Sequence, residues 1–322
     1  MRIAIWGAGA VGLGLASTLA KPGERLLLLG RDAATRAEIA REGIRRSGLF
    51  GERHVAADQL MIDHKPEALI DFAPDFLMIC TKTCDTKDLA ASLAPLSTKL
   101  PLGMKLLLCQ NGWGNETPFL SHWANDRLFR ASIITGFHRR SLANVEITAH
   151  AAAISLGSVF GVDESVLAPL ALRISNGGVP AEIEHDMLSV VWSKMLYNCA
   201  LNPLGALTNR RYGELTTESG TRAIVESVIH EIFGVLAARG VSLPWQDAAS
   251  YLEKFHAELI PPTAAHESSM LQDLRAGRPT EIEALCGAVE QLAEEAGLKT
   301  PINSALATLV REAEPKEANS AA

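Results

Sequence analysis

Aromatic side chains are scarce in this 322-residue chain, in which Phe, Trp and Tyr together make up only 5%. This scarcity argues against a protein that binds single-stranded nucleic acid by stacking many bases. Positive charge is not in excess either, because 30 Lys and Arg residues stand against 37 Asp and Glu residues, a net charge of −7. We therefore expect no broad basic surface for nucleic acid or anionic lipid, although a local basic pocket stays open.

Cysteine is also rare. The five cysteines form no CxxC pair, and four of them lie inside apolar runs. This pattern is typical of reduced thiols in a protein core, and it predicts a reducing compartment, the cytoplasm. The nine histidines form no HxH or HExxH group, so no metal site is predicted.

Charged residues are absent from residues 3–20, so a signal peptide or membrane span has to be considered there. Glycines at positions 7, 9, 12 and 14 interrupt this run, and no Leu-rich core of sufficient length follows. A targeting segment or membrane span is the alternative interpretation. A strand, a tight glycine turn and a helix explain the run better, so we expect no membrane partner.

The first half of the chain alternates short apolar runs with helical or turn-rich stretches. We expect strands at 3–6, 26–29, 76–80 and 106–109, helices at 10–20 and 33–42, and shorter edge strands at 132–135, 145–148 and 154–156. The longer apolar runs are continuous rather than alternating, which indicates strands buried on both faces of a parallel sheet covered by helices. The first half is therefore predicted to be an α/β domain.

The second half has a helical pattern throughout. Apolar residues recur at three- and four-residue spacing in six windows, 186–207, 220–239, 246–259, 263–276, 280–296 and 302–313. Gly177-Gly178-Val179-Pro180 interrupts regular structure between the halves and is the best hinge candidate. We expect two domains, 1–178 and an all-helical 179–322, with a polar, small-residue tail at about 312–322 that frays.

A glycine motif follows the first expected strand. Gly7-Ala8-Gly9-Ala10-Val11-Gly12 matches GxGxxG and opens the first expected helix. The first glycine permits the tight turn, the second lets a pyrophosphate approach the backbone, and the third allows close packing of helix on strand. A purely structural glycine turn is the alternative. Because strand, turn and helix occur in the right order, the motif predicts a Rossmann-type dinucleotide-binding domain.

The end of the second strand bears on which dinucleotide binds. NAD-preferring sites usually place an acid there, which accepts from the ribose 2′-hydroxyl. This strand ends in Gly30-Arg31, and a guanidinium there pairs with a 2′-phosphate through charge-assisted hydrogen bonds. Asp32 follows at once and is a rival for the ribose contact, and a solvated Arg31 is a further alternative. The balance favours NADP(H).

A polar stripe runs along the first helix of the second half. Lys194, Asn198 and Asn202 are spaced i, i+4, i+8 and so share one helical face, among apolar neighbours. A lysine at the edge of a buried surface can donate a proton to a developing alkoxide, and neighbouring amides can hold a polar substrate. A solvated lysine with two capping asparagines is the alternative from these residues alone.

A second polar cluster spans Glu267–Glu281. Ser268, Ser269, Gln272 and Asp273 fall on helical spacing. Gly277 and Pro279 then stop that helix, and a new helix is expected to start at Thr280 with Glu281 in its first turn. An acid there favours the helix dipole, which is the plain structural explanation of Glu281.

Taken in order, these motifs resemble one family. GxGxxG, a strand ending in Gln110-Asn111-Gly112, the pattern WxKxxxNxxxNPL around Lys194, and SSMxQDxxxGRxTEI ending near Glu281 are similar to 2-dehydropantoate 2-reductase, also called ketopantoate reductase. The resemblance covers nearly the whole chain, and the last two motifs are long and specific.

The resemblance implies a role for each matching residue. Lys194 is implied to be the general acid that protonates the ketone oxygen during hydride delivery from NADPH. Asn198, Asn202 and Ser269 match substrate-binding positions, the serine holding the carboxylate. Glu281 matches an acid that meets cofactor and substrate and Asn111 an amide near the nicotinamide and substrate. Lys82 and His138 fall on cofactor-binding positions beside those of the glycine turn.

Five positions depart from the family pattern. His138 stands just before Arg139-Arg140, where the family has a small residue near the cofactor. Tyr212 stands where the family often has Asn in Asn-Gly-Glu-Leu, and His266 stands three residues before the functional serine where an Asn is usual. In the TEIDxxNG motif, Glu283 replaces Asp and Cys286 replaces Asn. The reaction machinery is retained while several lining positions differ.

The main hypothesis is therefore an NADPH-dependent reductase that converts a 2-oxo acid to a 2-hydroxy acid. The first reaction to test is the reduction of 2-dehydropantoate to pantoate, which is a step of pantothenate and coenzyme A biosynthesis. One alternative is a paralogue that reduces a different 2-oxo acid. Another is an NADP-binding regulator without turnover, which has no need of Lys194, Asn198, Asn202, Ser269 and Glu281 together. The expected partner is a small molecule, and a homodimer contact through the helical half stays open.

Overall fold

The computed structural model describes residues 1–315 and divides into two compact units. The first unit contains Met1–Gln110 and Asn115–Leu188, and the second contains Asn111–Gly114 and the chain from Ser189 onward. The division thus falls after Leu188, whereas the sequence places it after Gly178. Of the tail expected to fray, residues 316–322 lie outside the described residues, and the last helix continues to Ala313.

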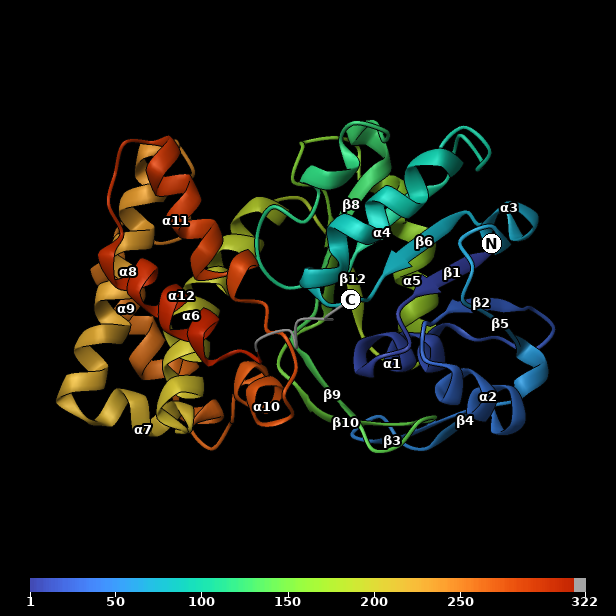
Figure 1. Cartoon of the computed structure of the whole chain (residues 1–322), viewed down its shortest axis with the longest axis horizontal. Coiled ribbons are helices and arrows are strands. Elements are labelled where there is room, and N and C mark those ends of the chain that lie inside the picture. Colours follow the sequence, from blue (N-terminus) through green and yellow to red (C-terminus); the bar gives the residue numbers. More distant parts are fainter. Residues whose placement is uncertain (316–322) are drawn as a thin grey trace, which may run out of the picture. The chain divides into compact units, whose positions relative to one another are not determined.

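The first unit is built around an eight-stranded sheet (Figure 1). Its strands are β1 (Ile3–Trp6), β2 (Leu26–Leu29), β5 (Leu60–Asp63), β6 (Phe76–Ile79), β7 (Lys105–Leu108), β8 (Leu128–Ser132), β11 (Ile154–Gly157) and β12 (Ala181–Glu184). They lie in the order β12-β11-β8-β7-β6-β1-β2-β5. Every neighbouring pair is parallel except β8 and β11, which are antiparallel. The four apolar runs expected to form a parallel sheet are β1, β2, β6 and β7.

Both faces of this sheet are buried, which explains the continuous apolar strands. Ile3 and Ile5 of β1 belong to one hydrophobic core, while Ala4 between them belongs to the core on the opposite face. The helices of this unit are α1 (Ala10–Leu19), α2 (Ala33–Glu42), α3 (Ala68–Phe72), α4 (Thr86–Leu93) and α5 (Ala168–Asn176). An α/β fold with a parallel sheet is therefore confirmed.

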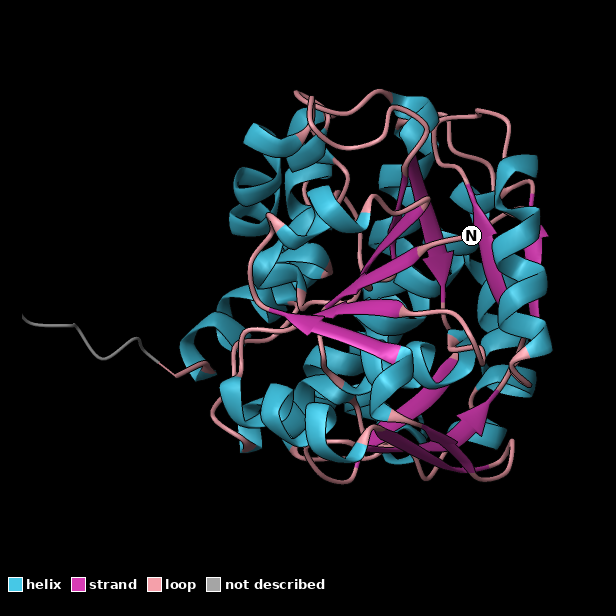
Figure 2. Cartoon of the chain, turned by 90° about the vertical axis from the view of Figure 1, so that its right-hand side faces the viewer, coloured by secondary structure: helices cyan, strands magenta, loops and turns pink. Residues whose placement is uncertain are grey.

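A second sheet covers α1 on its other side. Its strands are β3 (Ile44–Gly48), β4 (Arg53–Val55), β9 (Thr135–Arg139) and β10 (Asn144–His150), in the order β4-β3-β10-β9. Helix α1 packs against β3, β9 and β10, and a Cβ atom added to Gly14 would lie 2.3 Å from the Phe137 ring. All strands, drawn in magenta in Figure 2, belong to the first unit within the described part of the chain.

The position of α1 accounts for the uncharged run at residues 3–20. Every residue of this helix from Gly12 to Leu19 is buried, so no face needs to be polar. The run therefore forms a core strand and a core helix, as predicted. Among residues 1–315, no helix is both long and apolar enough to cross a membrane.

Four local predictions for the first unit need correction. The strand expected at 132–135 is wrong, because those residues contain the break between β8 and β9. Strands β3, β4, β5 and β12 are absent from the prediction. The sequences of β3 and β4 carry arginines instead of an apolar run. Strand β12 lies at Ala181–Glu184, so the prediction that 179–322 is all-helical is wrong at its start. Gly177-Gly178 lies inside the first unit, in the turn between α5 and β12. There a Cβ on Gly177 would lie 1.9 Å from the Thr18 carbonyl oxygen, so close packing rather than a hinge explains this glycine.

The second unit is helical throughout the residues described. Its helices are α6 (Met187–Thr208), which begins just before the division, α7 (Tyr212–Thr217), α8 (Ser219–Ala238), α9 (Ala248–Lys254), α10 (Ser269–Arg275), α11 (Cys286–Glu295) and α12 (Pro301–Ala313). Two boundaries differ from the prediction. The helix expected at 263–276 is α-helical only from Ser269, and the helix expected at 280–296 begins at Cys286, after a short 3-10 turn at Ile282–Ala284.

Candidate functional site

The glycine turn after β1 contains three glycines with different surroundings. Gly7 has φ +119°, and a Cβ there would lie 2.7 Å from the Cys80 carbonyl carbon. A Cβ on Gly12 would lie 1.7 Å from the Gly7 carbonyl oxygen. The Cβ position of Gly9, by contrast, has no heavy atom within 4 Å. The turn and the packing therefore require Gly7 and Gly12, while Gly9 keeps open the space that a pyrophosphate needs to approach the backbone.

The turn also lies where a dinucleotide binds in this class of fold. The chain runs from β1 to β2 and β5 on one side and then crosses to β6, β7 and β8 on the other, so the strand order reverses between β1 and β6. Ligands of open α/β sheets bind at the carboxyl edge of such a reversal. Gly9 is the N-cap of α1 and has no side-chain capping bond, so the first turn of the helix presents backbone N–H groups there.

Lys82 follows β6 at the same edge of the sheet. It is half-buried and caps the short 3-10 helix Thr83–Asp85. The buried side chain of Gln110 holds this loop, because its Nε2 donates to the Lys82 carbonyl oxygen at 3.2 Å and to Thr86 Oγ1 at 2.8 Å. Sequence reasoning gave Gln110 no role of its own.

The end of β2 clarifies the roles of Arg31 and Asp32. Asp32 is the N-cap of α2 and accepts a hydrogen bond from the Thr35 N–H at 2.8 Å, and the Thr35 hydroxyl bonds the same carboxylate oxygen. These hydrogen bonds lower the pKa of Asp32. Asp32 therefore serves the helix terminus. Arg31 is 86% exposed, and its Nη1 lies 3.0 Å from Asp85 Oδ1, a surface pair that a bound anion can replace at little cost.

Two further arginines gather around the start of α2, and sequence reasoning missed both. Arg36 Nη1 donates to the carbonyl oxygens of Gly30 at 2.8 Å and Arg31 at 2.6 Å. Arg139 Nη2 donates to Thr35 Oγ1 at 2.5 Å. The pair Arg139-Arg140 in the sequence was a signal that could have found one of them. Next to it on β9, His138 is exposed.

The catalytic candidates of the second unit share α6, as predicted. Lys194 and Asn198 are half-buried on this continuous helix, and Asn202 is buried. Pro203 lies inside the same helix and has no N–H to donate to the Cys199 carbonyl oxygen one turn earlier. The Cys286 thiol donates to that oxygen at 3.8 Å. Cys286, one of the departures from the family pattern, is buried and therefore belongs to the core that supports α6.

The departures Tyr212 and His266 lie together. Their rings are 5.1 Å apart, and the Tyr212 N–H donates to the His266 carbonyl oxygen at 3.2 Å. The Tyr212 hydroxyl donates to Asn202 Oδ1 at 2.6 Å. Tyr212 is only 4% exposed, and burial raises its pKa well above the ordinary value, so the hydroxyl stays protonated. The Tyr212 hydroxyl is therefore hydrogen-bonded to the side-chain amide of Asn202, a residue that is predicted to bind substrate.

Two serines at the start of α10 have separate roles. Ser268 is fully buried and is the N-cap, with its Oγ accepting from the Leu271 N–H at 3.0 Å. The same hydroxyl lies 3.4 Å from the Asn202 carbonyl oxygen, to which it donates. Ser269, the predicted carboxylate-binding residue, is the first residue of α10 and is exposed. Ser268 thus ties the start of α10 to α6, and Ser269 is left on the surface.

The structure brings Asn111 and Glu281 together, although 170 residues separate them. Asn111 Nδ2 donates to Glu281 Oε2 at 2.9 Å, and Glu281 is 8% exposed. The expectation that Glu281 lies in the first turn of an α-helix is wrong. The chain here forms a short 3-10 turn at Ile282–Ala284, and the α-helix begins only at Cys286. Gly112 and Trp113 pack against Ala284 in this turn.

Residues 111–114 follow β7 in sequence but belong to the helical unit. The Trp113 N–H donates to the Ala284 carbonyl oxygen at 2.7 Å, and the Trp113 ring lies 4.9 Å from that of Trp192 on α6. Gly112 has φ +84°, and a Cβ there would lie 2.3 Å from the Ala284 oxygen. Glycine is therefore required for this segment to approach Glu281.

Comparison with known families decides the assignment. The family described as Ketopantoate reductase PanE/ApbA matches residues 3–160, and its C-terminal domain matches residues 186–314. A 2-dehydropantoate 2-reductase of Aquifex aeolicus is 31% identical over 97% of this chain and 96% of its own length. The chain belongs to the ketopantoate reductase family. A 2-dehydropantoate 2-reductase of Halobacterium salinarum is 28% identical over 97% of this chain and 98% of its own.

Solved structures agree with this assignment. A 2-dehydropantoate 2-reductase of Geobacter metallireducens has a TM-score of 0.86 at 25% identity and covers 97% of this chain and 100% of its own. A PanE/ApbA family ketopantoate reductase of Ralstonia eutropha has a TM-score of 0.84 at 27% identity, covering 97% and 98%. A D-mandelate dehydrogenase solved with NADH and anilino(oxo)acetate shares the fold at 22% identity, with a TM-score of 0.84 and coverage of 97% and 98%.

Family membership confirms the resemblance drawn from the motifs. Ketopantoate reductases are NADP-dependent oxidoreductases that act on a CH–OH group of a small molecule, and this chain is such an enzyme. The glycine turn, the strand reversal and the arginines at the start of α2 fit an NADP(H) dinucleotide.

Proposed function

We propose that this protein reduces a 2-oxo acid to the 2-hydroxy acid with NADPH, and that 2-dehydropantoate is the first substrate to test. The observation that carries the proposal is the polar stripe of Lys194, Asn198 and Asn202 on one continuous helix, in a chain that matches the family over nearly its whole length. An NADP-binding regulator without turnover has no need of this stripe.

NADPH supplies a hydride to the keto carbon when it is bound. The glycine turn from Gly7 to Gly12 holds the pyrophosphate, and Arg31, Lys82 and His138 complete the cofactor contacts of the first unit. Asn111 and Glu281 contact both cofactor and substrate in this proposal.

Lys194 supplies the proton. As negative charge builds on the ketone oxygen, the Lys194 ammonium donates to that oxygen, which lowers the barrier only in the transition state. Asn198 and Asn202 bind the polar groups of the substrate without adding charge, and Ser269 binds its carboxylate. Tyr212 donates to Asn202 Oδ1, and the Nδ2 donors of Asn202 meet an acceptor oxygen of the ligand in this proposal.

One observation favours a second candidate substrate class, 2-oxo acids whose side chain carries no hydroxyl. 2-Dehydropantoate has a hydroxyl at the far end of its side chain, and a pocket recognises such a group by satisfying its hydrogen bonds. In this chain, Tyr212 and His266 stand where amides are usual, and the Tyr212 proton is already donated to Asn202.

NADPH oxidation with a matched pair of substrates tests both candidates. 3,3-Dimethyl-2-oxobutanoate has the carbon skeleton of 2-dehydropantoate and lacks only its hydroxyl. A higher kcat/KM for 2-dehydropantoate supports the first candidate, and a higher value for the analogue supports the second. NADPH binding without oxidation by either compound, or by a wider panel of 2-oxo acids, overturns the reductase proposal in favour of the regulator.

Two further proposals concern the protein in the cell. We expect it in the cytoplasm, and a homodimer formed through the helical unit is the assembly to test. Sedimentation velocity at several protein concentrations would measure the mass in solution and so decide between monomer and dimer.

A further inference from the structure

The segment Thr280–Leu285 carries Glu281 and contains only the short 3-10 turn Ile282–Ala284, with no α-helix. Glu281 has φ −100° and ψ +23°, and Leu285 has φ and ψ both at −106°, so neither residue continues an α-helix. The direction of the Glu281 carboxylate therefore depends on what holds its neighbours in the chain. One side of the segment meets Asn111 and Trp113, as described above.

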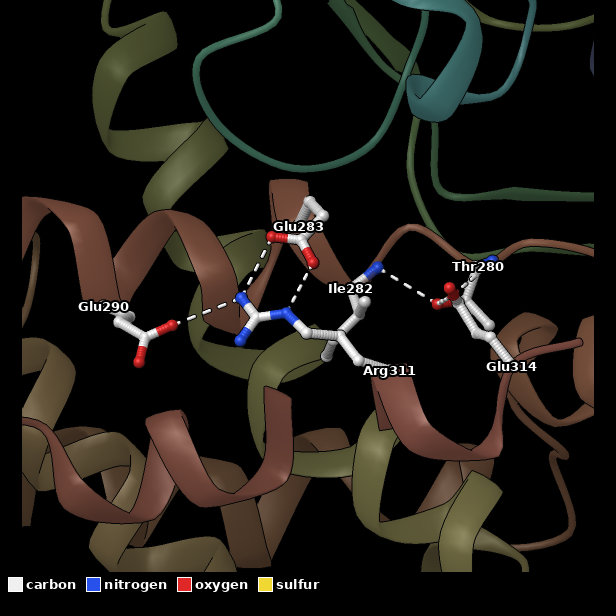
Figure 3. A network of polar contacts seen from close by, with 6 residues as sticks. All are labelled: Thr280, Ile282, Glu283, Glu290, Arg311 and Glu314. Atoms are coloured by element: carbon white, nitrogen blue, oxygen red, sulfur yellow. Dashed lines mark hydrogen bonds and ion pairs between the residues drawn. The ribbon is translucent and has the colours of Figure 1, made fainter. Parts of the chain in front are cut away.

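The other side of the segment is held by the end of α12 (Figure 3). The Glu314 carboxylate accepts two hydrogen bonds on Oε1, from the Thr280 N–H at 2.7 Å and from the Thr280 hydroxyl at 2.5 Å. The Thr280 Oγ1 in turn accepts from the Ile282 N–H at 3.2 Å. Thr280 is 5% exposed, so its donors have little access to water. The residues on both sides of Glu281 are thus held through one carboxylate.

Arg311, one turn earlier on α12, binds Glu283, the residue that follows Ile282. Its Nε and Nη2 contact the two carboxylate oxygens of Glu283 at 2.6 and 3.0 Å, and Nη2 lies 3.2 Å from Glu290 of α11 (Figure 3). These hydrogen bonds raise the pKa of Arg311 above its ordinary value. Because Glu283 is largely exposed, this pair is the weaker of the two attachments.

We propose that Glu314 is a positioning residue for the reaction, acting through Thr280 to set the direction of the Glu281 carboxylate. This inference rests on the proposed function, in which Glu281 contacts cofactor and substrate. The geometry supports it because Glu314 makes its two bonds directly beside Glu281, while Asn111 holds the Glu281 carboxylate itself. Removal of the Glu314 carboxylate leaves the buried Thr280 N–H and hydroxyl without their acceptor, and the segment must shift to satisfy them.

The test compares Glu314→Ala with Glu314→Gln and with Glu295→Ala, a matched control at the end of α11 whose carboxylate pairs with Arg239 on the surface. We expect Glu314→Ala to lower kcat/KM by ~10- to 100-fold, because small displacements of a reacting group cost up to about 100-fold. Glu314→Gln keeps an acceptor oxygen and should recover most of this loss. Glu295→Ala should stay within about twofold of the parent enzyme.

A double-mutant cycle with Glu281→Gln separates positioning from a general loss of structure. If Glu314 acts through Glu281, Glu314→Ala should lower kcat/KM little further in the Glu281→Gln background. A full, multiplicative loss in that background overturns the proposal, as does parent-like kcat/KM in Glu314→Ala itself. Thr280→Val removes one of the two donors and takes the place of Glu314→Ala in the cycle if thermal melts show that Glu314→Ala does not fold.

NADPH affinity is a second readout that does not require turnover. Titration of protein fluorescence should show a weaker Kd for NADPH in Glu281→Gln and in Glu314→Ala, and no additional weakening in the double variant. If the parent enzyme reduces no 2-oxo acid, the proposed function fails while this titration still decides the role of Glu314. An unchanged Kd in Glu314→Ala would then overturn the inference.

Discussion

At Asn202, one hydrogen bond orients the side-chain amide. The Tyr212 hydroxyl donates to Oδ1, so we expect an acceptor oxygen of the substrate to meet the amide N–H groups. In the proposed mechanism, Lys194, two turns earlier on the same helix, supplies the proton and a positive charge. The proposal therefore gives the side chains of α6 distinct roles, which single substitutions can separate.

The strongest residue-scale prediction concerns Lys194. Because the proton is donated only in the transition state, Lys194→Ala should lower kcat by ~10²–10⁴-fold, with little change in NADPH affinity. Lys194→Arg should recover little, since guanidinium is a poor acid at neutral pH. Steady-state kinetics and an NADPH titration measure the two effects. A kcat of Lys194→Ala near that of the parent enzyme would contradict the proposed role and support the alternative, in which Lys194 is a solvated helix residue.

A second residue-scale prediction concerns Arg31 and the choice of cofactor. Arg31→Ala should raise the KM for NADPH and barely change that for NADH, because only NADPH carries the 2′-phosphate. The loss should be ~1.5–3 kcal/mol, the usual contribution of a charged hydrogen bond. Initial rates with both cofactors measure it, and equal kinetics of the parent enzyme with NADPH and NADH would remove this role from Arg31.

Among the elements, the six residues from Gly7 to Gly12, which include the turn after β1 and the start of α1, combine close packing with the proposed pyrophosphate contact. Gly12 is required by contact with its own chain, whereas the Cβ position of Gly9 is open. The turn therefore offers two chemically identical substitutions with different expected consequences.

Gly9→Ala should leave the fold intact and weaken NADPH binding, because the added methyl group occupies the space through which the pyrophosphate approaches. Gly12→Ala should destabilise the first unit, since its Cβ would lie 1.7 Å from a backbone oxygen that cannot move freely. Thermal unfolding and NADPH titration of both variants check this contrast. Parent-like NADPH affinity in a folded Gly9→Ala variant would count against pyrophosphate binding at the turn.

At the scale of the whole molecule, carboxylates on both units have a lowered pKa. The pKa values of Glu24, Asp32 and Asp63 in the first unit, and of Glu226 and Asp247 in the second, fall below their ordinary values, each mainly through hydrogen bonds that the carboxylate accepts. A folded-state pKa below the unfolded-state value means that the unfolded chain binds more protons as the pH falls.

The free energy of unfolding should therefore decrease on acidification. The contribution of these groups is fully present above the ordinary values, 4.5 for Glu and 3.8 for Asp, and is lost as the pH falls through the lowered values of the folded state. Urea unfolding at a series of pH values from neutral to about 3 measures this slope. An Asp32→Asn variant should show a shallower slope, and an identical slope would contradict the role assigned to Asp32.

Local sequence patterns determined the elements whose apolar, polar or glycine residues recur at a regular spacing. The continuous apolar runs of β1, β2, β6 and β7 must be buried on both faces, and the glycine spacing after β1 admits only a tight turn. The helical stripe of Lys194, Asn198 and Asn202 follows from residue spacing alone. These features depend on neighbours a few residues away, which is why the sequence predicts them without the fold.

Tertiary structure alone decided the features that join distant segments. The second sheet pairs Arg45 with Asn144, and its strands carry arginines whose burial depends on carbonyl groups elsewhere in the chain, as for Arg46 and Gly177. Asn111 meets Glu281 only because residues 111–114 pack on the helical unit, and Glu314 meets Thr280 from another helix. Such contacts leave no periodic signal in the sequence, because each joins two single residues. Which residues meet depends on how whole elements pack against one another.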